Sequence, residues 1–181
     1  AYTSAPLSNP ADARRIVGVL IGCAFLFPIG LLDDWLELGW LPQLIGQLGA
    51  AVIAITSTVF IERFTNPFSG AIVELNLWPV VGPVLVFILT CFWIVGMMNT
   101  VNWLDGLDGL AAGVGAIAAI LFAVHMVSLA QQHVSLYALA LAGACLGVLP
   151  FNFNPARVFL GGTGAMVLGY SLATLSILAP A

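Results

Sequence analysis

The sequence predicts an all-α, polytopic membrane protein with about six transmembrane helices, forming a single domain over residues 1–181. Hydrophobic residues make up 61% of the chain and charged residues only 7%, whereas a soluble protein carries about 25% charged residues. The apolar runs are long enough to cross a bilayer as helices. They are also continuous, whereas the strands of a membrane barrel would alternate polar and apolar side chains.

Each predicted span is an apolar run bounded by polar residues, glycine or proline. About 20 apolar residues cross a bilayer as a helix, and by that measure the runs 16–32, 136–150 and 165–179 are short. Glycine-rich stretches such as 109–115 favour close helix packing, and the small residues of the second and fourth spans would also allow a homodimer. The predicted spans are 16–32, 41–61, 80–98, 110–130, 136–150 and 165–179.

The few ionisable residues exclude several classes of protein. The four basic residues besides histidine are all arginines and the net charge is −4, so the basic surface of a nucleic-acid-binding protein is missing. The three cysteines have no CxxC spacing, which argues against a zinc site or a disulfide framework. Arg14 and Arg15 before an apolar run imitate a signal peptide, but that run ends in Asp33-Asp34 rather than in a cleavage site.

Residues 62–79 differ from the rest of the chain. This segment contains Asn66-Pro67, Ser69-Gly70 and a short alternating stretch at 72–77. Turn residues beside alternating residues are typical of a hairpin. We therefore predict an extramembrane loop with a short hairpin.

Three polar junctions punctuate the spans: Asp33-Asp34, the run 99–108, and the run 151–164. Two predicted spans separate each junction from the next. An even number of crossings returns the chain to the same side of the membrane, so all three junctions are expected at one face. Ionisable groups are costly at a membrane, so acids at the edge of a span favour a functional site.

The chemistry of each junction is open when the junction is taken alone. Asp33 and Asp34 repel each other unless a cation or base neutralises them; they suit a Mg²⁺ ligand or a base toward phosphate, and equally a solvated helix end. Asn102, Asp105 and Asp108 are spaced three apart, which places them on one face of a helix start. Oxygen ligands suit Mg²⁺, although a polar helix cap would use the same residues.

The third junction is rich in glycine and enters a predicted helix. Backbone N–H groups at such a helix start can bind phosphate, and Arg157 lies beside them in the sequence. An ordinary loop leading into a short helix is the alternative interpretation.

Taken together, the motifs resemble those of the polyprenyl-phosphate N-acetylhexosamine-1-phosphate transferases (glycosyltransferase family 4). This family includes phospho-N-acetylmuramoyl-pentapeptide transferase and undecaprenyl-phosphate N-acetylglucosaminyl-1-phosphate transferase. The resemblance extends over roughly residues 14–179. The motifs are Gly30-Leu-Leu-Asp33-Asp34, Asn99-x-x-Asn102-x-x-Asp105-Gly-Leu-Asp108-Gly-Leu-Ala-Ala-Gly113, and Asn154-Pro-Ala-Arg-Val-Phe159-Leu-Gly161-x-x-Gly164.

The resemblance implies an enzyme of the cell membrane. It would transfer N-acetylhexosamine-1-phosphate from a UDP-sugar to polyprenyl (undecaprenyl) phosphate in cell-wall or surface-polysaccharide synthesis, with Mg²⁺ as cofactor and UMP as product. The motif loops would be cytoplasmic. The arginine count alone favours the opposite orientation, because Arg157 is the only arginine on the motif side.

The resemblance also implies roles for single residues. Asp33 or Asp34 would engage the lipid phosphate as a catalytic base, or the metal. Substrate binding would involve Asn99, Asn102, Asp105, Asp108, Arg157 and Phe159, the last against uracil; the metal ligands would be Asp34, Asp105 and Asp108.

Two residues depart from the family pattern. The third motif of the family normally reads Gly-Asp-x-Gly-Ser, and here Gly162 replaces the metal-binding Asp while Ala165 replaces the Ser. The family also has about ten spans and a His-rich loop beyond the sixth span of this chain. We therefore expect a fragment or a degenerate member, with severely impaired turnover. The alternatives are a non-catalytic homologue or subunit that binds nucleotide or lipid phosphate and, with little support, an ion or proton transporter.

Overall fold

The computed structural model describes residues 10–65, 70–75 and 81–179 and is dominated by helices. Five of these helices are long and apolar enough to cross a membrane, and α2, with 17 residues, is a shorter apolar helix. The predicted all-α polytopic membrane fold is therefore confirmed. The helices are α1 (Pro10–Leu36), α2 (Trp40–Thr56), α3 (Val81–Leu104), α4 (Leu110–Ser128), α5 (Gln132–Asn152) and α6 (Gly161–Leu178).

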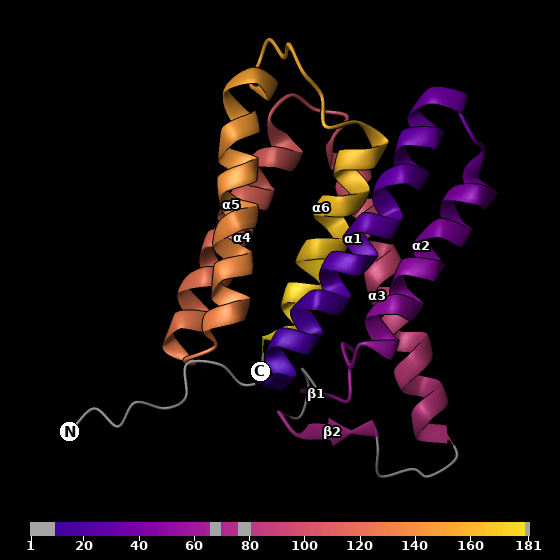
Figure 1. Cartoon of the computed structure of the whole chain (residues 1–181), viewed down its shortest axis with the longest axis vertical. Coiled ribbons are helices and arrows are strands. Elements are labelled where there is room, and N and C mark those ends of the chain that lie inside the picture. The colour runs from indigo at the N-terminus through magenta and orange to yellow at the C-terminus, as the bar shows by residue number, and fades with distance from the viewer. Residues whose placement is uncertain (1–9, 66–69, 76–80, 180–181) are drawn as a thin grey trace.

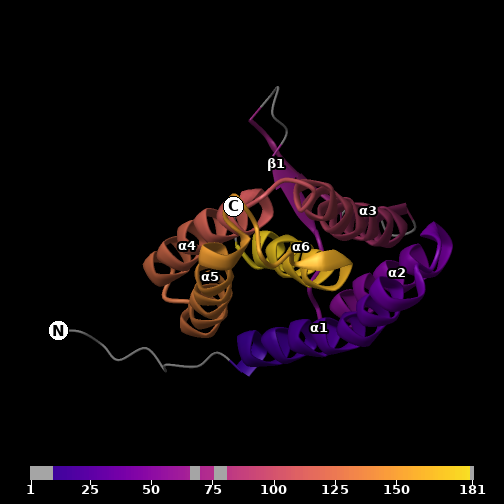
Figure 2. The same ribbon diagram turned by 90° about the horizontal axis from the view of Figure 1, so that it is seen from above.

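Helix α6 forms the centre of the bundle. It packs most extensively on α3 and α1 and also contacts α4, α5 and α2 (Figure 2). Within its most apolar window 67% of the residues are buried, against 28–39% for the other four candidate spans. The helices α4 and α5 form a hairpin on one side of α6, and α1 and α2 form another. A shift of α6 would therefore alter the packing of each of the other helices.

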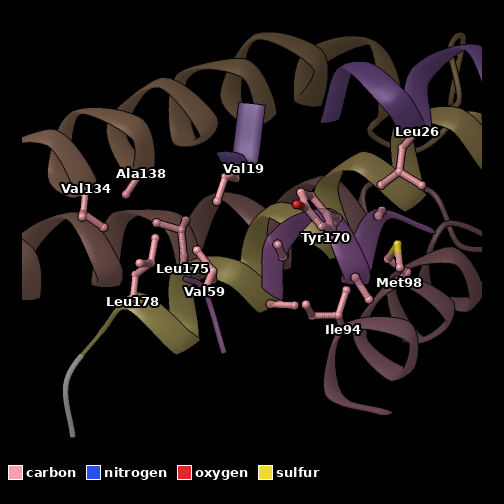
Figure 3. Packing of buried hydrophobic residues seen from close by; sticks show 14 of the residues in the cluster. Val19, Leu26, Val59, Ile94, Met98, Val134, Ala138, Tyr170, Leu175 and Leu178 are labelled. Atoms are coloured by element: carbon pink, nitrogen blue, oxygen red, sulfur yellow. The ribbon is translucent and has the colours of Figure 1, made fainter. Parts of the chain in front are cut away.

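The main hydrophobic cluster brings side chains of all six helices together around α6 (Figure 3). Tyr170 is fully buried and lies between Leu26 of α1 and Met98 and Ile94 of α3. Alanines supply much of the remaining contact surface, which allows close packing of helices that lack a hydrophobic driving force in lipid.

Several helix boundaries differ from the predicted ones. Helix α1 continues through Asp33 and Asp34, and α3 continues through Asn99 and Asn102. Helix α6 begins four residues before the predicted span, while α2 ends five residues early. The predictions ended at polar side chains, but the helical backbone bonds of α1 and α3 run past them. Helix α2 ends because the chain turns back at Thr58, which has a φ of 64°.

The segment after α2 contains a two-stranded antiparallel sheet. Strand β1 (Arg63–Thr65) pairs with β2 (Ile72–Glu74), with Phe64 opposite Val73. Residues 66–69 and 76–79 of the predicted loop lie outside the described residues. The sheet lies at the end of the bundle opposite the α5–α6 connection (Figure 1).

The predicted placement of the polar junctions at one face is confirmed. The end of α1, the connection from α3 to α4 and the connection from α5 to α6 meet at the same end of the bundle (Figure 1), where Asp34 and Asp105 both contact the start of α6.

Gly30 allows α1 to approach α6 closely at that end. A Cβ atom added at Gly30 would lie 2.6 Å from the Cα of Thr163, which is closer than real Cβ atoms come to backbone. The bare backbone at Gly30 therefore sets the separation of the two helices one turn before Asp34.

Gly30→Ala should destabilise the protein by about 1–3 kcal/mol, because the added methyl group forces two helices apart. Gly96→Ala is the matched control: Gly96 is also inside a helix, and a Cβ there would meet nothing within 4 Å. The control should be neutral or stabilising by up to about 1 kcal/mol. Thermal unfolding of both variants in detergent tests the contrast, and equal melting midpoints would contradict it.

Candidate active site

Asp34 binds the start of α6 through both of its carboxylate oxygens. The backbone N–H of Gly162 donates to Oδ1 over 2.8 Å, and the N–H and hydroxyl of Thr163 donate to Oδ2 over 3.1 and 2.6 Å. The first N–H groups of a helix have no partner inside the helix, and a negative charge at this end is favourable. The arrangement thus joins two segments that are 128 residues apart in sequence.

Asp105 is the second carboxylate at this helix start. It follows the last residue of α3, and its Oδ2 accepts the N–H of Gly161 over 3.0 Å. Burial raises the pKa of Asp105 and the nearby negative charge of Asp34 adds to the rise, while N–H groups of Gly161 and Leu160 oppose it. Partial burial therefore disfavours the charged form of Asp105.

Two carboxylate oxygens of the site are buried without a hydrogen-bond partner among the described residues. They are Oδ1 of Asp33 and Oδ1 of Asp105. A buried polar atom without a partner is costly, and for a carboxylate the natural partners are a cation, a proton or a hydrogen-bond donor. These two oxygens are therefore the best candidates for contact with a ligand.

The remaining acid, Asp108, organises the connection before α6. Its Oδ2 accepts the side-chain N–H of Asn154 over 2.9 Å and the backbone N–H of Ala156 over 3.0 Å. Asn152 adds a second bond between the connections: its Oδ1 accepts the N–H of Gly109 and its Nδ2 donates to the carbonyl of Val158. The α3–α4 and α5–α6 connections are thus tied to one another.

The predicted shared helix face of Asn102, Asp105 and Asp108 is wrong. Helix α3 ends at Leu104 and α4 begins at Leu110, so Asn102 lies in a helix while the two acids lie in the turn that follows. Asp105 meets the start of α6, whereas Asp108 meets the connection that precedes it.

The other predicted binding residues are placed in different surroundings. The Nδ2 of Asn99 donates to Oε1 of Gln47 over 2.9 Å and to the carbonyl of Val95, so this amide serves packing between α2 and α3. Asn102 is half-buried, and Arg157 is exposed. The side chain of Phe159 is 57% exposed, which leaves it open for stacking.

Three residues of this end were not predicted to act: Gln47, Asn152 and Thr163. Gln47 and Asn152 are each only 1% exposed, and Thr163 is 8% exposed. A signal existed for Gln47, since an amide inside an apolar span must find a partner, whereas Asn152 lies in the third polar junction, where nothing in the sequence singled it out. For Thr163 nothing in the sequence indicates that its hydroxyl faces an acid from α1.

The described residues contain no group of three or more His, Cys, Asp or Glu that could hold a metal ion. In the part of the chain that the structure describes, Asp34, Asp105 and Asp108 do not form such a group, and their role as metal ligands stays a prediction. Both oxygens of Asp34 and one of Asp108 already accept N–H groups. Carboxylate oxygens without a partner, such as those of Asp33 and Asp105, are the type of ligand that Mg²⁺ takes, usually one or two together with substrate phosphates.

A cavity of about 460 Å³ lies beside Asp34, between α1, α5 and α6. Its walls include Phe27 and Leu31 of α1, Leu141 of α5 and Val167 of α6. Asp34 and Thr163 are its main polar lining residues. An apolar chain carrying a polar head would match this distribution.

The fold and the site together define a multi-pass membrane protein with an acidic site at one end of its helix bundle. The model of glycosyl transferase family 4 matches residues 16–179. The chain therefore belongs to glycosyl transferase family 4, and the resemblance of its motifs is confirmed.

Individual relatives agree with this family. A probable undecaprenyl-phosphate N-acetylglucosaminyl 1-phosphate transferase of Bacillus subtilis (strain 168) is 35% identical over 164 residues, covering 91% of this chain and 44% of that protein. A phospho-N-acetylmuramoyl-pentapeptide-transferase of Desulforudis audaxviator (strain MP104C) is 37% identical over 185 residues, covering 92% of this chain and 53% of that protein. The chain thus spans about half the length of these relatives.

Asn152→Ala should destabilise the protein, because the N–H of Gly109 and the carbonyl of Val158 would lose their partner. Each orphaned group costs about 1–3 kcal/mol. Asn154→Ala is the control, since Asn154 lies at the exposed surface and donates a side-chain hydrogen bond to Asp108. Chemical denaturation should show a larger loss for Asn152→Ala; a loss no larger than that of the control would count against the role of Asn152.

Asp105→Asn should raise thermal stability at neutral pH. A carboxyl whose pKa is raised on folding contributes stability that is present at low pH and lost as the pH rises through that pKa. The amide oxygen of Asn can still accept the N–H of Gly161 but carries no charge. Melting curves from about pH 4 to pH 8 should show an advantage for the variant that grows with pH; a constant difference would sink the explanation.

Proposed function

We propose that this chain forms part of a transferase that moves N-acetylhexosamine-1-phosphate from a UDP-sugar to polyprenyl phosphate. Membership of the family and the names of the relatives support the reaction class. The observation that carries the proposal here is the convergence of Asp33, Asp34 and Asp105 on the start of α6, with two buried carboxylate oxygens still free.

The proposed reaction exchanges one P–O bond for another. An oxygen of the lipid phosphate attacks the phosphorus that carries the sugar, and the bond from that phosphorus to the bridging oxygen breaks. The products are a polyprenyl diphosphate sugar and UMP. Catalysis of phosphoryl transfer depends mainly on positioning and on neutralising charge.

Asp33 is the residue that we assign to the lipid phosphate. Its neighbour Asp34 has both oxygens engaged by α6, whereas Asp33 keeps a buried oxygen free. The apolar cavity beside Asp34 supports a lipid as one substrate, because a polyprenyl chain could lie there while its phosphate stays at the polar end.

Asp105 and the turn around Asp108 would face the nucleotide and its diphosphate. We assign Phe159 to the base, because its exposed ring can stack on uracil. Arg157 supplies a positive charge within the same connection.

A cation is needed at this end, because several carboxylates would otherwise repel the substrate phosphates. Mg²⁺ would supply positive charge to the diphosphate when bound, and Asp33 and Asp105 are the residues that would hold it. We also propose that this end of the bundle faces the cytoplasm at the cell membrane. A homodimer is part of the same proposal.

Gly162 favours a second candidate function, that of a non-catalytic homologue that binds nucleotide. In the family pattern an Asp stands at this position, and here the first turn of α6 provides backbone N–H groups without an additional carboxylate. Binding without efficient turnover is the outcome that this alternative predicts.

Two measurements on the purified chain test these proposals. Calorimetric titration with UMP and Mg²⁺ should show binding that Asp105→Asn weakens about tenfold or more, since a charge-assisted contact is worth about 1.5–3 kcal/mol. The second measurement is release of UMP from UDP-N-acetylglucosamine in membranes with polyprenyl phosphate. Asp33→Asn should lower this release more than Asp105→Asn does.

Glu37→Gln is the control, because Glu37 is an exposed acid that directly follows α1 and, among the described residues, makes no side-chain bond to α6. Binding without UMP release would favour the non-catalytic alternative. No binding at millimolar UMP would contradict both candidate functions.

A further inference from the structure

The space that a side chain at position 162 would need is taken by Asp34. A Cβ atom added at Gly162 would lie 2.8 Å from Oδ1 of Asp34 and 3.7 Å from Oδ2 of Asp33. The same Oδ1 accepts the N–H of Gly162 over 2.8 Å. The Asp34 carboxylate can therefore bind here because residue 162 has no side chain.

We propose that Asp34 is a positioning residue, which holds the first turn of α6 in the room left by Gly162 and through it orients Asp105 for the reaction. The part of this inference that concerns Asp105 rests on the proposed function. The part that concerns α6 rests on contacts alone.

The contacts of Asp34 are those of a helix cap supplied from another helix. Three donors of α6, two N–H groups and one hydroxyl, meet its two oxygens. Leu160, at the N-cap position of α6, makes no side-chain hydrogen bond to the helix. Asp34 therefore provides what a local Ser, Thr or Asp would otherwise provide at a helix start.

The link to Asp105 passes through a single peptide. Gly161, with a φ of 68°, donates its N–H to Asp105, and the next two residues donate to Asp34. If Asp34 is removed, the first turn of α6 loses three bonds and the N–H of Gly161 loses its fixed direction. Oδ1 of Asp105, the free oxygen, then no longer has a defined place.

The same geometry predicts the effect of restoring the family residue at position 162. Gly162→Asp alone would displace Asp34 from its donors and bring a third carboxylate beside Asp33 and Asp34. When Asp34→Ala and Gly162→Asp are combined, the carboxylate is in effect moved from position 34 to position 162. The side chain at 162 then no longer collides with the carboxylate of residue 34. The new carboxylate then lies in the first turn of α6, where negative charge is favoured.

The test compares the full chain, as the parent, with the variants Asp34→Ala and Gly162→Asp and with the double variant. Glu37→Gln is the charge control. Hydrogen exchange of peptides covering residues 160–165 reports on the first turn of α6, and peptides covering 171–176 report on its middle. Asp34→Ala should speed exchange of the first turn about tenfold or more, because charge-assisted bonds are lost. Gly162→Asp should also speed it, and the double variant should return most of the way to the parent.

Affinity for UMP with Mg²⁺ separates positioning from a general loss of stability. Ile94→Ala is the control for stability, since Ile94 is fully buried in the core. Asp34→Ala should weaken UMP binding about tenfold, Ile94→Ala should leave it unchanged, and the double variant should regain affinity. Equal loss of affinity in Asp34→Ala and Ile94→Ala would overturn the positioning role.

The exchange data stand apart from the proposed function. If the parent binds no UMP, the proposed function fails while the exchange data still decide the role of Asp34 at α6. Unchanged exchange at 160–165 in Asp34→Ala, or additive effects of the two substitutions in the double variant, would overturn the inference.

Discussion

The site depends on how the first turn of α6 is held. Its backbone N–H groups need acceptors, and Asp34 and Asp105 provide them from the ends of α1 and α3. The first N–H groups of a helix have no acceptor inside the helix, so acceptors from other segments stabilise its start. One set of hydrogen bonds therefore joins the ends of three helices and fixes the positions of Asp34 and Asp105.

The central place of α6 makes this arrangement effective. The helix is enclosed by its neighbours along most of its length, with Tyr170 in the middle of the core. Close approach at Gly30 brings α1 against the first turn. Because packing in protein interiors is dense, α6 has little freedom to slide relative to the helices around it.

The same arrangement leaves acidic groups that lower the stability of the fold but are available to a ligand. Carboxylate oxygens without partners, such as Oδ1 of Asp33 and of Asp105, destabilise the fold, and a ligand with positive charge would relieve that cost. Gly162 changes how the acids are used. With no side chain at 162, Asp34 acts as an acceptor for α6, and fewer acids remain for a cation and its phosphates.

Composition and the length of the apolar runs were sufficient to predict the membrane class, the helical fold and the number of helices, because the bilayer allows few alternatives. Counting crossings also placed Asp34 and Asp105 at one end. Neither pattern could show that Asn99 would pair with Gln47 inside the bundle, or that Thr163 would face Asp34. Both depend on contacts between distant segments.

The sequence by itself therefore determined which residues could form a site and at which end of the bundle they lie. Periodicity and hydropathy depend on neighbouring residues, so they carry this information directly. Only the tertiary structure decided which oxygens are engaged and which are free. That distinction between Asp33 and Asp34, adjacent in sequence, arises because the two side chains leave α1 in different directions and only Asp34 meets the N–H groups of α6.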